Sequence, residues 1–111
     1  MTTTTLPGWQ SYMADSRFPT MDGSTSTTSI DYNQQGITGT IPTEFGLLTD
    51  VTELNLGRNE FTRTIPTQLG QLSKVTFNFR LDSNQLCSTV PTEVQALSSG
   101  VTSKWQVTTG N

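Results

Sequence analysis

One phrase occurs twice between residues 37 and 72, and this repetition constrains the fold more than any other feature. Pro66 repeats Pro42, and the apolar and glycine positions on either side of the two prolines coincide when the segments are aligned on them. We call the separation of Pro42 and Pro66 the repeat distance. A third copy places Pro91 one residue beyond this distance from Pro66, so one residue has been inserted between them. Self-similarity with a period of roughly 20–30 residues is typical of stacked solenoids, in which each repeat packs against its neighbours.

The segments that precede the prolines indicate short strands. In Val51–Phe61, Leu54 and Leu56 flank a polar residue, which predicts a strand with both leucines inside. In the corresponding segment Val75–Leu86, Val75 lies one repeat distance after Val51. Asn84, however, lies one residue beyond that distance from Asn59. The insertion therefore lies within residues 76–78, where we expect a longer strand with a bulge.

Weaker copies extend the pattern in both directions. Upstream, residues 27–37 have apolar side chains one repeat distance before Leu54, Leu56 and Phe61. Downstream, Val101–Val107 has the apolar spacing of a further strand, with Trp105 expected to cover the end of the stack. We therefore divide the chain into a low-complexity or capping segment at 1–28, a repeat region at 29–107 and a tail at 108–111. Within the first segment, apolar spacing predicts a short helix that ends at Pro19.

Composition narrows the possible functions. A chain of 111 residues forms one domain, and its formal charge of −3 argues against nucleic acid, which binds basic surfaces. The absence of histidine removes Ser-His-Asp and Cys-His catalysis, and the single cysteine cannot form an internal disulfide. The sequence has no apolar run long enough for a membrane span and no glycine-rich phosphate loop. We expect no catalysis, cofactor or metal.

The segment Val51–Leu72, VTELNLGRNEFTRTIPTQLGQL, resembles the plant-type leucine-rich repeat LxxLxLxxNxLxGxIPxxLGxL. It is similar to repeats of receptor-like kinase ectodomains and of algal arrays. The resemblance implies an α/β-type right-handed solenoid of about three to four coils, with short parallel strands on the concave face and irregular or 3-10 turns on the convex face. It departs from the family where Arg63 and Ser88 replace a glycine, and the cysteine pairs of secreted members are absent.

The resemblance also assigns roles to individual residues. Interior asparagines are expected to satisfy backbone groups of the turns and prolines to form the corners, which gives the structural set Asn59, Asn84, Pro42, Pro66 and Pro91. Strand residues that point away from the core are expected to form a concave partner-binding face: Asp31, Asn33, Glu53, Asn55, Arg58, Asn78, Arg80 and Asp82. Because this face covers only about 250 Å², tight binding would need further surface.

We therefore expect a non-catalytic recognition module for a protein or peptide ligand, part of a longer receptor-like or scaffold protein. Self-association through open solenoid ends is a further possibility. The family suggests an extracellular or membrane-attached location, but the sequence shows no signal peptide, membrane span or cysteine cap. Two alternatives remain open, a purely structural spacer and an ice-binding protein. The latter would use threonines that recur at equivalent positions of the repeats, Thr38 with Thr62 and Thr40 with Thr64 and Thr89.

Overall fold

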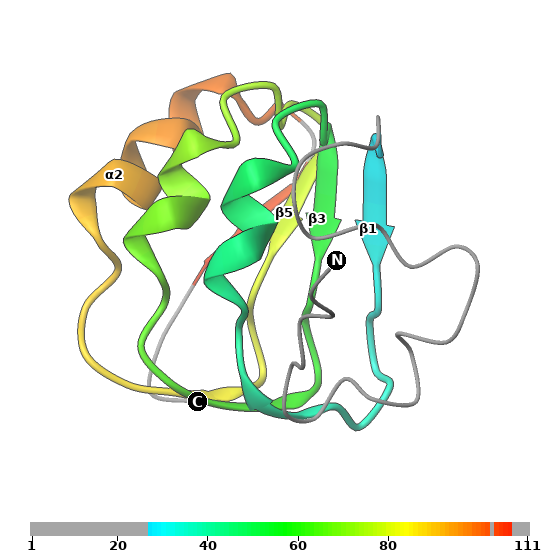
Figure 1. Ribbon diagram of the computed structural model, residues 1–111, viewed down its shortest axis with the longest axis vertical. Coiled ribbons are helices and arrows are strands. Elements are labelled where there is room, and N and C mark those ends of the chain that lie inside the picture. The colour runs from blue at the N-terminus through cyan, green and yellow to red at the C-terminus, as the bar shows by residue number, and fades with distance from the viewer. Residues whose placement is uncertain (1–26, 103, 108–111) are drawn as a thin grey trace, which may run out of the picture.

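A computed structural model describes residues 27–102 and 104–107 of the chain. The helix expected before Pro19 lies outside the described residues. The described elements alternate between short strands and helical turns (Figure 1). In chain order they are β1 Ser29–Asp31, β2 Thr38–Thr40, η1 Thr43–Leu47, β3 Glu53–Asn55, β4 Glu60–Arg63, η2 Thr67–Gln71, β5 Asn78–Arg80, β6 Gln85–Leu86, α2 Thr92–Gln95, η3 Ala96–Gly100 and β7 Lys104–Gln106.

The first sheet is parallel and contains one strand from each sequence repeat, in the order β1-β3-β5-β7. Leu54 lies opposite Ile30 on one side and opposite Phe79 on the other. Trp105 continues this row beyond Phe79, and the two rings stack with centroids 5.0 Å apart. Ile30 and Leu54 are one repeat distance apart, whereas Phe79 lies one residue beyond that distance from Leu54. This pairing confirms the inserted residue that the sequence indicates between Val75 and Phe79.

A second parallel sheet, β2-β4-β6, was not expected from the sequence. Its strands pair with a shift relative to the sequence repeat, so that Thr40 rather than Thr38 lies opposite Thr62. Thr38 lies opposite Glu60, and Thr62 lies opposite Gln85 on its other side. The expected register of the threonines is therefore wrong at the paired strands, because it assumed that equivalent residues of successive repeats pair directly.

Helical turns lie on the opposite side of the molecule from the first sheet (Figure 1). Each of η1, η2 and α2 follows one of the three repeated prolines, whose φ values of −65°, −64° and −58° suit the residue before a helical turn. Gly46 and Gly70 lie where successive turns approach closely. A Cβ on Gly70 would lie 2.7 Å from Glu93 Cβ, and a Cβ on Gly46 would overlap the backbone of Gln68. These glycines are required for packing.

The hydrophobic core fills the space that the two sheets and the helical turns enclose. Leu54 and Leu56, which were expected inside, are completely buried, as are Phe61, Leu69, Leu72, Phe79 and Leu81. The longer strand expected in this segment does not form: β5 contains only Asn78–Arg80, and Phe77, just before it, is 57% exposed, whereas Val75 and Phe79 are buried. The backbone N–H groups of Thr76 and Phe77 both donate to Thr52 O, at 3.1 and 3.2 Å.

Two buried asparagines hydrogen-bond the backbones of adjacent repeats. Asn59 Oδ1 accepts from the N–H groups of Gln35 and Ile37 at 3.0 and 3.1 Å. Its Nδ2 donates to the carbonyl of Tyr32 at 2.9 Å and to those of Leu56 and Gly57 in its own repeat. One side chain thus satisfies backbone groups of two repeats, which would otherwise be buried without partners.

Asn84 repeats this arrangement one repeat later. Its Oδ1 accepts from Phe61 N–H at 3.0 Å, and its Nδ2 donates to the carbonyl of Leu56 at 3.0 Å. Further bonds reach the carbonyls of Leu81 and Asp82 in the repeat of Asn84 itself.

A positive φ recurs at two equivalent positions in three successive repeats, and Gly36 in the first of them has one as well, at 67°. One group consists of Gln34, Arg58 and Ser83, with φ of 58°, 58° and 57°, and follows the strands of the first sheet. The other consists of Gly39, Arg63 and Ser88, with φ of 88°, 68° and 65°. Glycine adopts the left-handed conformation without steric cost, which explains why the repeat pattern has glycine at the position of Gly39. Arg63 and Ser88 adopt the same conformation at a steric cost.

Candidate functional site

The candidate site is the face of the first sheet that points away from the core. Because Ile30, Leu54, Phe79 and Trp105 contact the core, their strand neighbours point the other way. We call this surface the polar face and define it by the side chains that alternate with the core row. They are Ser29, Asp31, Asn33, Glu53, Asn55, Gly57, Asn78, Arg80, Asp82, Lys104 and Gln106.

One row of the polar face is connected by hydrogen bonds through Glu53. Ser29 Oγ donates to Glu53 Oε1 at 2.8 Å, and Asn78 Nδ2 donates to Glu53 Oε2 at 3.1 Å. Lys104 lies beside Asn78 in the next strand and is exposed. The carboxylate of Glu53 is thus held between two strands in a fixed orientation.

The opposite end of the face contains an ion pair between Arg80 and Asp82. Arg80 Nε and Nη2 donate to the two carboxylate oxygens of Asp82, each at 3.1 Å. Burial raises the pKa of Asp82, but the hydrogen bonds and charge of Arg80 outweigh it, together with a backbone hydrogen bond and the charge of Arg58. The pKa of Asp82 therefore lies below its ordinary value, and the carboxylate is ionised at neutral pH.

Three side-chain oxygens converge above Gly57, which lacks a side chain. A Cβ at this position would lie 3.0 Å from Asp82 Oδ1, 3.3 Å from Asn33 Oδ1 and 3.4 Å from Asn55 Oδ1. Asn55 Oδ1 also accepts from Gly57 N–H at 3.1 Å, and the residue is only 6% exposed. The expectation that Asn55 is an accessible contact residue is therefore not met, because its neighbours cover it and its oxygen bonds the adjacent backbone.

The polar face has more hydrogen-bond acceptors than its own donors satisfy. Three buried side-chain oxygens among the described residues have no hydrogen-bond partner, and all three belong to this face: Asn33 Oδ1, Asn78 Oδ1 and Gln106 Oε1. A buried acceptor without a donor is unfavourable by about 1–3 kcal/mol. Such groups are uncommon in proteins, and all three of them lie on this face.

The structure brings most of the predicted contact residues together. Asp31 is exposed, and Asn33, Glu53, Asn78, Arg80 and Asp82 are partly exposed. Arg58 is exposed but lies in the left-handed turn after β3, beyond the paired strand. Lys104 and Gln106 were absent from the prediction, although the spacing around Trp105 already indicated a strand there and could have identified them.

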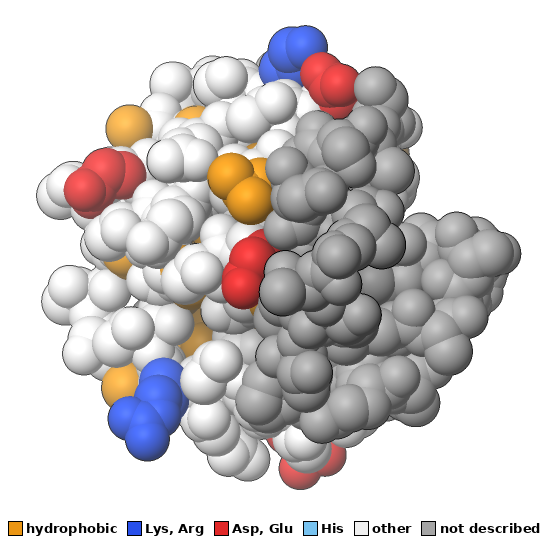
Figure 2. Space-filling model, viewed as in Figure 1, with side chains coloured by type: hydrophobic (Ala, Val, Ile, Leu, Met, Phe, Trp, Pro, Cys, Tyr) orange, Lys and Arg blue, Asp and Glu red, His pale blue; other side chains and the backbone are white. Residues whose placement is uncertain are grey.

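The described surface that is visible in Figure 2 consists largely of uncharged polar side chains and backbone, with isolated charged residues and small hydrophobic areas. Within residues 27–102 and 104–107, no three His, Cys, Asp or Glu side chains come together as metal ligands. No helix in this part of the chain has the length and apolar character to cross a membrane.

Comparison with protein families identifies the repeat itself. The family model of the leucine-rich repeat matches residues 50–72. This match covers β3, β4 and η2, the best copy of the sequence pattern. The chain therefore contains a leucine-rich repeat, and its parallel strands fit the fold of such proteins. A search of curated proteins found no match to the chain.

Proposed function

We propose that the chain is a non-catalytic recognition module that binds a protein or peptide ligand through the polar face. The repeats form a right-handed solenoid of plant type, in which this face is the concave surface. The observation that carries the proposal is the parallel sheet of the leucine-rich repeat, which aligns outward polar side chains from four strands on one face. Exposed groups of this face, such as Asp31 and Lys104, can pair with polar groups of a partner, whereas a purely structural spacer has no need of them.

The electrostatic character of the face supports a polar partner. The face carries three acidic residues, Asp31, Glu53 and Asp82, and two basic residues, Arg80 and Lys104, so neither sign of charge dominates. Such a mixture favours specific, directional contacts over nonspecific attraction. No comparable observation favours ice binding, because the register of the second sheet places Glu60 and Gln85 opposite threonines.

The size of the face indicates how a partner engages it. The four strands cover about 250 Å², whereas a stable interface buries about 800 Å² on each partner. Tight binding therefore involves additional surface at the margins of the face, or further repeats of a longer receptor-like or scaffold protein. A second copy of the chain, associating through the ends of the sheet, is a weaker candidate for the partner. Sedimentation measurements would detect such self-association.

The test is a selection of binding peptides from a random displayed library on the folded chain. Asp31→Arg and Lys104→Glu each reverse an exposed charge on the polar face, and Glu93→Arg makes a matched change on α2, outside it. Arg80 is left unchanged because its substitution would break the pair with Asp82. We expect the two face variants to weaken the selected peptides at least about tenfold and Glu93→Arg to leave them unaffected. Peptides that respond only to Glu93→Arg would refute the proposal.

A further inference from the structure

The inserted residue of the third repeat has a structural consequence next to the polar face. Val75 keeps the repeat distance from Val51, whereas Phe79 lies one residue beyond that distance from Leu54. The extra residue must be accommodated between Val75 and Phe79, and both of these side chains remain in the core. Phe77, which alternation would otherwise place in the core, is instead 57% exposed.

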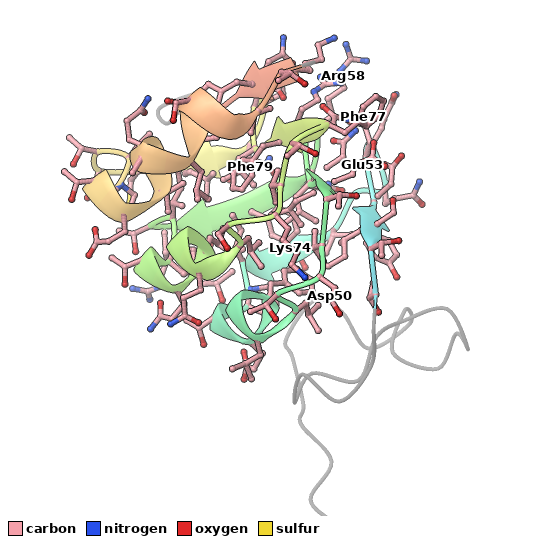
Figure 3. The ribbon with its side chains drawn as sticks, turned by 90° about the horizontal axis from the view of Figure 1, so that it is seen from above. Asp50, Glu53, Arg58, Lys74, Phe77 and Phe79 are labelled. Carbon is pink, nitrogen blue, oxygen red and sulfur yellow. The ribbon has the colours of Figure 1, made fainter. Side chains whose placement is uncertain are left out.

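Exposure of this aromatic ring is unusual within the described residues. Phe77 and Leu47 are the exposed large hydrophobic side chains in this part of the chain. Leu47 ends η1 on the helical side, whereas Phe77 immediately precedes β5 in the first sheet. Figure 3 shows Phe77 at the outside of the molecule on the same side as Glu53, while Phe79 lies inside.

The neighbours of Phe77 are polar groups with fixed orientations. Asn78 follows it directly, donates its Nδ2 to Glu53 and leaves Oδ1 without a donor. The backbone carbonyl of Phe77 is occupied, since it accepts from Lys104 N–H at 3.1 Å. An exposed apolar ring beside exposed polar side chains such as Lys104 is the arrangement of an interface anchor, which combines apolar burial with polar contacts.

We propose that Phe77, at the margin of the polar face, is the principal contact residue for the partner that binds there. Its occupant is an extended peptide segment of the partner, with an aliphatic or aromatic side chain over the ring and charged groups that complement the exposed Asp31 and Lys104. This inference rests on the proposed function and specifies it. It also supplies surface at the margin of the face, where the strands alone are too small for stable binding.

The experiment uses peptides selected on the full chain, as above, and compares two truncations of exposed apolar residues. Phe77→Ala should weaken the selected peptides at least about tenfold, and Phe77→Trp should retain binding because it keeps an aromatic surface. Leu47→Ala is the matched control, and it should leave binding unchanged. Because both residues are exposed, neither alanine variant should change thermal stability appreciably.

A double-mutant cycle then identifies the contact. Each apolar residue of a selected peptide is replaced by alanine and measured against the wild-type chain and Phe77→Ala. We expect one peptide residue to couple to Phe77 by about 3- to 10-fold. Binding that is lost in Asp31→Arg and Lys104→Glu but retained in Phe77→Ala would overturn the inference while leaving the proposed function intact. Equal losses in Phe77→Ala and Leu47→Ala would also overturn it.

Discussion

At the scale of single residues, Asn59 and Asn84, the buried asparagines that bond adjacent repeats, are the most specific structural determinants of the chain. Each combines an acceptor and two donor hydrogens in one short side chain: the oxygen accepts from the preceding repeat, and the nitrogen donates to both the preceding repeat and its own. A leucine in the same place could fill the volume but could not pair these backbone groups. The sequence pattern keeps asparagine here because the turn of one repeat depends on a side chain from the next.

We predict that Asn84→Ala lowers the free energy of unfolding by about 3 kcal/mol, because it leaves Phe61 N–H and the carbonyls of Leu56 and Leu81 without this partner. Chemical denaturation measures the effect. Asn78→Ala is the matched control and should lower stability by about 1 kcal/mol or less, since it removes one bond of a partly exposed side chain. Similar losses in both variants would contradict the assignment.

A second prediction at this scale concerns pH. The pKa of Asp82 is lowered in the folded protein, so its ionised form stabilises the fold at pH values above its unfolded pKa of about 4. This contribution is lost as the pH falls through the folded value. Wild type should therefore exceed Asp82→Asn in stability at pH 7, and the difference should shrink steadily below about pH 4. Urea denaturation measures the stability difference between the two proteins at each pH. A difference that grows on acidification would contradict the prediction.

At the scale of elements, the contact between successive helical turns depends on glycine. A Cβ on Gly70 would lie 2.7 Å from Glu93 Cβ and 2.9 Å from the Glu93 carbonyl group, so a backbone must move to admit it. We predict that Gly70→Ala lowers the free energy of unfolding by about 1–3 kcal/mol.

Gly100→Ala provides the control, because the nearest atom to a Cβ there is Val75 O at 3.9 Å. It should change stability by no more than about 0.5 kcal/mol in either direction. Thermal unfolding of the two variants side by side tests the difference. If Gly70→Ala is as stable as Gly100→Ala, the turns are not packed as closely as described.

The first sheet could be predicted from the sequence because its strands follow the repeat distance. Leu54 and Leu56 alternate around a polar residue, and the equivalents of Leu54 in neighbouring repeats lie where the spacing puts them. The second sheet could not be predicted in this way. Its strands pair with a shift relative to the repeat, and β2 contains only Thr38, Gly39 and Thr40, without an apolar alternation.

The candidate site shows the same limit. The residues of the polar face follow from strand alternation, but the sequence cannot show that Asn55 is covered by its neighbours or that Asn78 leaves an oxygen without a donor. The outward displacement of Phe77 was equally hidden, because an insertion can be absorbed inward or outward. In the structure Val75 and Phe79 both remain in the core, and Phe77 between them lies outside.

At the scale of the whole molecule, each sequence repeat supplies the packing surface of the next. The core side chains of β1, β3 and β5 lie in one row, and the asparagines connect the turns beside it. The same stacking aligns the outward side chains into the polar face. Recognition in our account is therefore a direct consequence of the repeat, since adding a strand adds a column of polar residues.

The register of the two sheets tests this account most directly. Nuclear Overhauser contacts in the folded chain should join the methyl groups of Leu54 to both Ile30 and the ring of Phe79. In the second sheet they should join Thr40, not Thr38, to Thr62. Absence of the Leu54 contacts, or a Thr38–Thr62 contact in place of the Thr40–Thr62 contact, would show that the repeats do not stack in this register. Either result would contradict the polar face, which depends on that register.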